Sequence, residues 1–283
     1  MNKFTLFLNC VFCILLMAFS SNDVPTDIEK VDLKLKQDQV AMTFLDLTSG
    51  EALLIQHGNG QTILVNTGGP NTQLELQRHL KLYDIKAIDT LIVTKNDPEY
   101  NSNTEWLSTN YMIGEIITSQ NYPTTFEGRH EKWKTGQKVE LLPGLNTHVI
   151  QGNENTQSIG MDLLFTFHNN QVLYMTSADI EIENALLEKL DLSTVNILKV
   201  ADFAHNGGTS EPFVEHIDPQ VAIIFQKRGV HSSQDVIERL QETWIDIYLT
   251  KQFGNITIKF NNEDYEIITI SVESSSHIQV EML

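Results

Sequence analysis

The sequence predicts an α/β (α+β) fold in which two mixed sheets are flanked by helices. Two observations indicate this architecture: short apolar runs bounded by turn residues follow one another after residue 40, and mixed strand and helix segments come after them. With 283 residues, of which 41% are hydrophobic, the chain is long enough to bury the core of such a fold. The sequence contains no internal repeat, low-complexity run or interdomain linker. We therefore expect one domain over residues 41–283.

The first part of this domain is expected to be rich in strands. Strands are expected at residues 42–47, 52–56, 62–66, 88–94 and 114–118. Helices are expected from the Thr-Gly-Gly-Pro break at 67–70 to about Tyr83, and at 104–109. Residues 121–137 hold one proline and two glycines, and we expect them to form a long loop over the surface.

The second part continues with alternating strands and helices. Strands are expected at residues 147–151, 162–168, 172–176 and 195–200, with a helix at 182–190. The last third repeats strand, loop and helix segments at 212–216, 221–225, 233–242 and 245–250, and it closes with a hairpin of 255–260 and 265–272. Val236, Ile237, Leu240 and Trp244 are expected to form one buried helical face.

The N-terminus has the layout of a signal peptide. An uninterrupted apolar run at residues 5–19 follows Lys3, and small residues before position 21 favour cleavage after Ser20. The run is shorter than the roughly 20 residues that span a bilayer, although an uncleaved N-terminal anchor is the alternative. Residues 21–40 are polar and form a tether. We therefore expect the domain to be extracytoplasmic, either secreted or anchored to the membrane by residues 1–20.

Cysteine content and charge exclude several classes of function. Cys10 and Cys13 both lie in the apolar run, so its removal leaves neither disulfides nor Cys-based zinc ligands. The formal net charge of −18 repels phosphate backbones, and no Lys/Arg cluster with interleaved aromatic residues offsets it. Nucleic acid is therefore disfavoured as a partner.

The stretch 91–100, Leu-Ile-Val-Thr-Lys-Asn-Asp-Pro-Glu-Tyr, carries the most informative pattern. An apolar run that ends at threonine and continues into a polar loop and a helix resembles the zinc loop of metallo-β-lactamase-fold hydrolases, Thr-His-x-His/Asp-x-Asp-His. Lys95 and Tyr100 stand at the two outer histidine positions of that loop, and Glu99 stands at its aspartate position. Asp97 alone remains a plausible ligand as it stands.

Further segments resemble, in the same order, the metallo-β-lactamase-like domain of ComEC, the bacterial DNA-uptake channel protein. Residues 44–52 are similar to its motif Leu-Asp-Val-Gly-Gln-Gly-Asp-Ala, and 62–69 resemble Ile-Asp-Thr-Gly-Gly. Residues 155–158 and 172–179 resemble Asn-x-x-Ser followed by the strand that ends in Thr-Gly-Asp. Residues 197–203 fall where the family has Leu-Lys-Val-Gly-His-His, and 228–231 match Tyr-Gly-His-Pro. The resemblance implies an αββα metallo-β-lactamase-like sandwich that corresponds to the detached soluble domain.

The resemblance carries over a degenerate metal site. Its positions are Lys95, Asp97, Glu99, Tyr100, Asp179 and Asp202. Because zinc sites favour imidazole ligands and this set contains no histidine, zinc is not expected, nor is any other cofactor. We expect Lys95 to supply the missing positive charge by pairing with one of the carboxylates. His205 and His231 are expected to lie outside the ligand set, as second-shell residues.

An all-oxygen metal site is the alternative. Asp97, Glu99, Asp179 and Asp202 could hold Mg²⁺, Mn²⁺ or Ca²⁺, which favour carboxylate ligands. Two functional hypotheses follow from the two versions of the site. The first is a non-catalytic pseudoenzyme that binds an unknown protein or small molecule at the cell surface. The second is a metal-dependent hydrolase, a phosphodiesterase or nuclease, with a possible link to DNA uptake.

Overall fold

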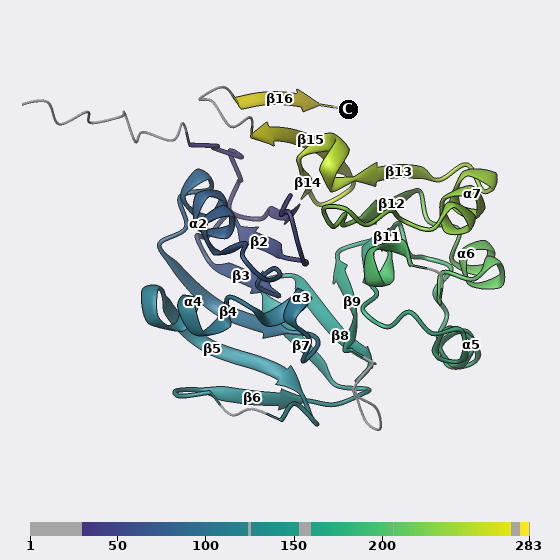
Figure 1. Cartoon of the computed structure of the whole chain (residues 1–283), viewed down its shortest axis with the longest axis horizontal. Helices are drawn as coiled ribbons and strands as arrows, with labels where there is room; N and C mark the ends of the chain where they lie inside the picture. Colours follow the sequence, from purple (N-terminus) through teal and green to yellow (C-terminus); the bar gives the residue numbers. More distant parts are fainter. Residues whose placement is uncertain (1–29, 124–125, 153–159, 206, 273–277, 283) are drawn as a thin grey trace, which may run out of the picture.

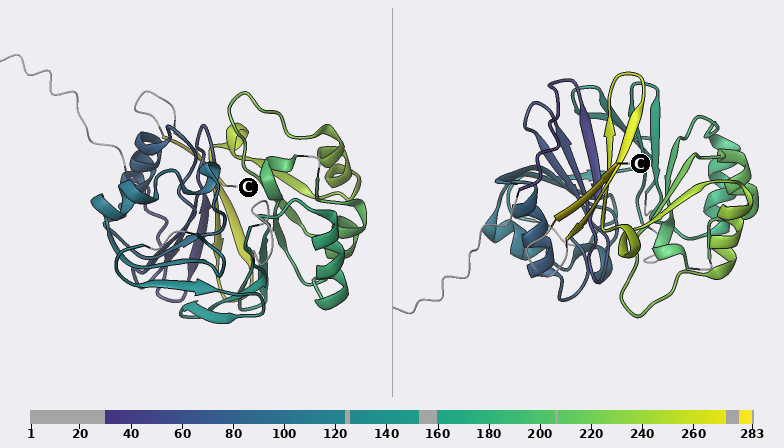
Figure 2. Two further views of the ribbon diagram at one scale, coloured as in Figure 1. Left: turned by 60° about the horizontal axis from the view of Figure 1, so that its bottom comes forward. Right: turned by 90° about the horizontal axis from the view of Figure 1, so that it is seen from above.

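The computed structural model describes residues 30–123, 126–152, 160–205, 207–272 and 278–282. Within this part of the chain, two mixed sheets lie face to face and helices cover their outer faces (Figures 1 and 2). The predicted αββα architecture is confirmed. The predicted signal segment, with Cys10 and Cys13, and the segment 155–158 lie outside the described residues.

The first sheet has nine described strands in the order β16-β15-β14-β1-β2-β3-β4-β5-β6. Their bounds are β1 Val40–Phe44, β2 Leu53–His57, β3 Thr62–Val65, β4 Ala87–Val93, β5 Met112–Ser119, β6 His130–Trp133, β14 Asn255–Phe260, β15 Tyr265–Val272 and β16 Ile278–Met282. Strands β3 to β6 pair in parallel, whereas β14, β1, β2 and β3 pair antiparallel. The N-terminal and C-terminal segments of the domain therefore meet in one sheet, with β1 hydrogen-bonded to β14.

The second sheet has seven described strands in the order β13-β12-β11-β10-β9-β8-β7. Their bounds are β7 Lys138–Leu142, β8 Leu145–Gln151, β9 Asp162–Phe167, β10 Asn170–Tyr174, β11 Ile197–Lys199, β12 Val221–Ile224 and β13 Asp246–Leu249. Strands β10 to β13 are parallel, so their carboxyl ends share one edge with the loops that follow them.

Helices cover the outer face of each sheet. The bounds of these covering helices are α2 Gln73–Leu82, α4 Thr104–Asn110, α5 Ile180–Lys189, α6 Glu211–Ile217 and α7 Gln234–Glu242. The short helices α3 Pro98–Asn101, η1 Ala201–Ala204 and α8 Thr250–Phe253 follow β4, β11 and β13. Helix α2 packs Leu76 and Leu80 on the first sheet, whereas α6 and α7 pack Phe213 and Leu240 on the second. None of the described helices has the length and apolar character that a membrane span requires.

The largest core lies between the two sheets. Phe44 of β1, Phe165 of β9, Phe260 of β14 and Trp133 of β6 all contribute to it and are at most 1% exposed. Short strands whose residues are buried on both faces explain the near-continuous apolar runs of the sequence. The helix-facing residues form two further clusters, one outside each sheet.

The structure corrects two sequence predictions. The predicted surface loop at 121–137 contains β6, which extends the first sheet in parallel with β5 and buries Trp133. The proline and the glycines of this segment indicated a loop, although the four residues between them form an edge strand. The predicted buried helical face ends before Trp244, whose φ of 60° lies outside the helical region and whose side chain is 93% exposed.

Candidate functional site

Residues 94–102, which follow β4 and include α3, form the metal loop, which contains the predicted ligand positions Lys95, Asp97, Glu99 and Tyr100. Asp97 begins α3, and its carboxylate accepts a hydrogen bond of 2.9 Å from the backbone N–H of Glu99. This capping bond satisfies an amide that the first turn of a helix leaves without an intrahelical partner. Asp179 caps α5 in the same way: its carboxylate accepts hydrogen bonds of 2.8 and 3.2 Å from the backbone N–H groups of Glu181 and Ile182. Two of the four predicted carboxylates thus serve as helix caps.

Tyr100 is a core residue. Its side chain is 1% exposed, and its ring lies 6.4 Å from that of Phe203. Burial raises the pKa of Tyr100 well above its ordinary value, and the nearby charges of Glu51 and Asp202 raise it further. Its hydroxyl oxygen has no hydrogen-bond partner among the described residues. Tyr100 therefore stays neutral and fills space at a position where the family has a ligand.

Lys95 does not form the predicted ion pair. Its ammonium lies over the ring of Tyr100, 5.3 Å from the ring centroid, and the described residues offer it no carboxylate within 4.0 Å. The prediction of a Lys95 ion pair was wrong, and a lysine from a distant part of the chain pairs with a carboxylate of this loop instead. Lys227, which follows β12, pairs with Glu99. The second oxygen of Glu99 accepts a bond of 2.6 Å from the hydroxyl of Ser49.

Asp202 lies in a strained turn that follows β11. Asp202, Phe203 and Ala204 have φ values of 45°, 57° and 59°, a left-handed conformation that L-residues adopt at a cost of roughly 1–2 kcal/mol each. The ring of His205 lies 3.8 Å from the Asp202 carboxylate. His205 is thus beside one predicted site carboxylate, whereas His231 is exposed in the loop after β12.

A second ion pair lies deeper, between the two sheets. Lys199 of β11 pairs with Glu51, which precedes β2, and both side chains are 0% exposed. The Lys199 ammonium also donates a bond of 2.9 Å to the carbonyl of Met175 and lies 4.6 Å from the ring centroid of Tyr174. Burial raises the pKa of Glu51 and lowers that of Lys199, and the attraction between the two groups opposes both shifts.

Close backbone packing holds Glu51 in place. Its N–H donates to the carbonyl of Glu99 at 2.9 Å, and its carbonyl accepts from Gly68 at 2.9 Å. Gly50 precedes it with a φ of 78°, and a Cβ there would lie 2.0 Å from the nitrogen of Gly69. A larger residue at position 50 would therefore push apart the loops that hold Gly50, Gly68 and Glu99.

Hydrogen bonds extend the Glu51–Lys199 pair into a network that joins the sheets. Tyr174 donates to Glu51 at 3.1 Å and accepts from Asn66 at 3.0 Å. The side-chain oxygen of Asn66 accepts from the backbone and hydroxyl of Thr94, at 2.9 and 3.0 Å. The network therefore runs from β11 to the residue that opens the metal loop.

Asp162 is a further buried acid near this network. One of its oxygens accepts backbone bonds from Thr176 and Ser177 at 2.5 and 2.8 Å. The other oxygen has no partner among the described residues. Burial raises the pKa of Asp162 to about 7, and the two backbone bonds partly oppose this shift.

The sequence of the chain is similar to part of two curated proteins. No protein-family model matches the chain. Recombination protein 2 from Haemophilus influenzae is 26% identical over 275 residues, which cover 92% of this chain and 33% of that protein. ComE operon protein 3 from Bacillus subtilis is 21% identical and covers 77% of this chain and 33% of its own length. The chain therefore spans about a third of the length of these curated relatives.

Solved structures match the fold at low sequence identity. The metallo-β-lactamase-fold protein YhfI from Bacillus subtilis superposes with a TM-score of 0.58 at 9% identity, covering 79% of this chain and all of that one. A putative metal-dependent hydrolase from Parabacteroides distasonis gives a TM-score of 0.51 at 13% identity, covering 74% and 92%. The domain therefore has a metallo-β-lactamase-like fold, and its sequence is similar to part of Recombination protein 2 and of ComE operon protein 3.

Three of the four carboxylates at the predicted ligand positions are engaged by other residues of the protein. In the described part of the chain, no three His, Cys, Asp or Glu side chains converge closely enough to hold an ion. Asp97 and Asp179 are engaged as helix caps, and Glu99 is engaged by Lys227 and Ser49. The alternative all-oxygen site of Asp97, Glu99, Asp179 and Asp202 is thus not assembled among the described residues.

Sequence reasoning missed the residues that join the halves of this domain. Glu51, Lys199 and Lys227 were not predicted as site residues, although the first two lie in segments that resemble ComEC motifs. One signal was available: Lys199 stands inside the apolar run Ile-Leu-Lys-Val, and a lysine in a buried strand requires an acidic or other polar partner. Its partner could not be identified, because Glu51 lies 148 residues away along the chain.

Proposed function

We propose that this ComEC-type domain is a non-catalytic member of the metallo-β-lactamase superfamily that serves a binding role at the cell surface. The observation that carries this proposal is the engagement of its former ligand positions. Two carboxylates cap helices, one is neutralised by Lys227, and Tyr100 is part of the core. A metal ion would have to displace Lys227 and Ser49 from the two oxygens of Glu99 before that carboxylate could serve as a ligand.

The location in this proposal comes from the relatives and from the N-terminal sequence. Recombination protein 2 and ComE operon protein 3 favour a setting related to competence, and residues 1–20 have the layout of a signal peptide or anchor. The domain would then act outside the cytoplasm and bind a protein or a small molecule. Its net charge of −18 makes a nucleic-acid backbone the least suitable partner.

A metal-dependent hydrolase is the second candidate. The turn at Asp202 favours it, because three successive left-handed residues are a form of strain that folds usually retain near functional groups. The neighbouring His205 could then serve as an acid or base beside Asp202. The resemblance to the putative hydrolase from Parabacteroides distasonis is compatible with this candidate at the level of fold.

A phosphodiesterase assay separates the two candidates. Purified protein is incubated with bis-p-nitrophenyl phosphate and with Zn²⁺, Mn²⁺, Mg²⁺ or Ca²⁺ in turn, beside an Asp202→Ala variant. The binding role predicts a rate equal to that of the variant with every metal. A metal-dependent rate that disappears in Asp202→Ala would replace the binding role with the hydrolase.

A further inference from the structure

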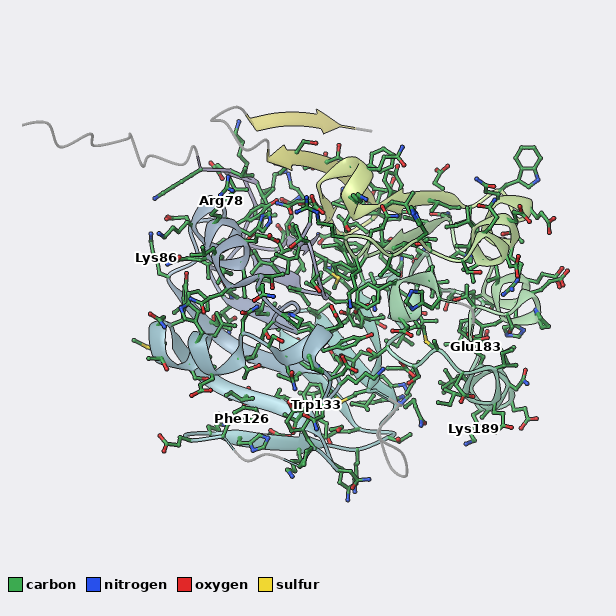
Figure 3. The ribbon with its side chains drawn as sticks, viewed as in Figure 1. Arg78, Lys86, Phe126, Trp133, Glu183 and Lys189 are labelled. Carbon is green, nitrogen blue, oxygen red and sulfur yellow. The ribbon has the colours of Figure 1, made fainter. Side chains whose placement is uncertain are left out.

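A cavity beside the described residues lies next to α4. It has a volume of about 700 Å³ and is lined by residues of three segments, the metal loop, α4 and the loop before β6. The lining residues are Asn96, Asn101, Ser102, Thr104, Glu105, Ser108, Thr109, Tyr122, Phe126 and Glu127. Figure 3 shows Phe126 next to β5 and β6, well apart from Glu183 and Lys189 of α5. The volume is in the range of pockets that hold small organic ligands.

The charge of this lining is negative. Glu105 and Glu127 are exposed, and neither carboxylate is paired with any described residue. No lysine, arginine or histidine is among the described residues that line the cavity. An anionic ligand would therefore meet repulsion here, and a cationic ligand would meet two free carboxylates.

The hydroxyl groups of the lining present acceptors. Ser108 donates its proton to the carbonyl of Thr104 at 2.9 Å, and Thr109 donates to the carbonyl of Glu105 at 3.0 Å. Ser102 donates in the same way to Pro98 at 2.7 Å. Because each proton is directed back to the helix backbone, the lone pairs of these oxygens are left for a ligand. A ligand rich in N–H and O–H donors matches this surface.

An amide and an aromatic ring also line the cavity. Asn101 donates to Asn96 at 3.2 Å and to the hydroxyl of Tyr122 at 2.8 Å, so its own oxygen remains an acceptor. The ring of Phe126 is half-buried against Tyr122, with centroids 5.9 Å apart. A ring at the wall of a polar cavity can pack against the C–H face of a sugar or below an ammonium group.

We propose that this cavity binds a ligand that carries protonated amines together with hydroxyl groups, the chemistry of an amino sugar. The carboxylates recognise the ammonium groups, the serine and threonine oxygens accept from the hydroxyl groups, and Phe126 packs against the sugar ring. The inference rests on the proposed binding role, for which it supplies the ligand class.

The test is a binding titration of the full chain with the glucosamine disaccharide, followed through backbone amide chemical shifts. The site predicts that amides of residues 102–109 shift, and that the N-acetylated disaccharide binds about tenfold or more weakly because its charge is lost. Glu105→Gln combined with Glu127→Gln should weaken the amine ligand by a similar factor. Glu188→Gln combined with Glu215→Gln, which removes two exposed charges from α5 and α6, is the matched control and should bind as the parent does.

Three results would overturn the proposal. The first is equal affinity for the charged and the N-acetylated sugar, and the second is unchanged binding in the double variant of Glu105 and Glu127. The third is equally tight binding of spermidine at the same amides, which would show that the hydroxyl contacts contribute nothing. Each of these results leaves the phosphodiesterase assay unaffected, so a failure of this inference is distinguishable from a failure of the binding role.

Discussion

Two lysine–carboxylate pairs join the halves of this domain, and they differ mainly in burial. Lys199 and Glu51 are 0% exposed and lie between the sheets. Lys227 and Glu99 are 33% and 17% exposed and lie at the rim, beside the metal loop. Both pairs place an ammonium from the second half of the chain against a carboxylate from the first half.

The difference in burial determines what each pair contributes. A charge pair in water is weakened by screening, whereas removal of one partner from a buried pair leaves a charge without compensation. Each buried charge of the inner pair therefore requires the other, and the outer pair is a weak connection between loops. The metal loop keeps its shape without help from Lys95, because the backbone N–H groups of Glu51 and Thr67 donate hydrogen bonds to the carbonyls of Glu99 and Tyr100.

The inner pair should show the largest effect. Lys199→Met leaves Glu51 buried without its cation, and we expect the free energy of unfolding to fall by about 3–5 kcal/mol. Chemical denaturation measures this loss. The double variant Lys199→Met with Glu51→Gln removes both charges and should recover most of the stability. A loss below about 1 kcal/mol in the single variant would contradict this prediction, because it would show that the inner pair contributes no more than an exposed ion pair.

A buried histidine extends the comparison to pH. His79 of α2 bonds to the carbonyl of Asp46 at 2.8 Å and to the Asn255 amide at 3.0 Å, and burial lowers the pKa of His79 to about 4. Between pH 6.5 and 4 the unfolded chain binds the proton more tightly, so stability falls as pH falls through this window. The loss from His79 should reach about 3 kcal/mol at pH 4.

His79→Gln should remove that part of the pH dependence. Denaturation curves at pH 6.5 and 4 measure it as the difference between variant and parent, which cancels the contribution of other titrating groups. His216→Gln, on the exposed side of α6, is the control and should keep the parent's pH dependence. A parent and a His79→Gln protein with the same pH dependence would disprove the assignment.

The outer pair should show a smaller effect. Lys227→Met leaves Glu99 with its bond from Ser49 and with access to water, so we expect a loss of at most about 1 kcal/mol. High salt should reduce this loss further, because half-exposed charges are screened. A loss as large as that of Lys199→Met would remove the distinction between the two pairs.

Lys95→Met should show the smallest effect. The ammonium gains only its contact with the Tyr100 ring, which at a half-exposed position stabilises by about 0.5–1 kcal/mol, and methionine retains part of that packing. Thermal melting of the variant should therefore stay close to that of the parent. A strong drop in melting temperature would restore Lys95 as the cation of the site.

The fold was largely predictable from the sequence because its strands are local patterns. The run that forms β4 and the hairpin of β14 and β15 were identified by their apolar and turn residues. The edge strand β6 was missed because four residues with one buried side chain give no clear alternation. Local patterns of this kind do not predict which strands pair when the strands are far apart in the sequence.

The site was less predictable because its contacts join segments that are distant in the sequence. The resemblance located Asp97, Glu99 and Asp179, but their partners depend on which loops the two sheets bring together. Lys95 is four residues from Glu99, yet Lys227, 128 residues away, makes the ion pair. The prediction that Lys95, which stands at a ligand position of the resembled loop, supplies the cation was therefore wrong.

The metal content of the purified protein tests the central claim most directly. That claim is that the chain's own lysines, rather than a metal, hold the degenerate site of this metallo-β-lactamase-like domain. Elemental analysis of protein prepared without chelator should find well under one zinc, manganese, magnesium or calcium ion per chain. One tightly held ion per chain, whose removal lowers the melting temperature, would contradict the claim.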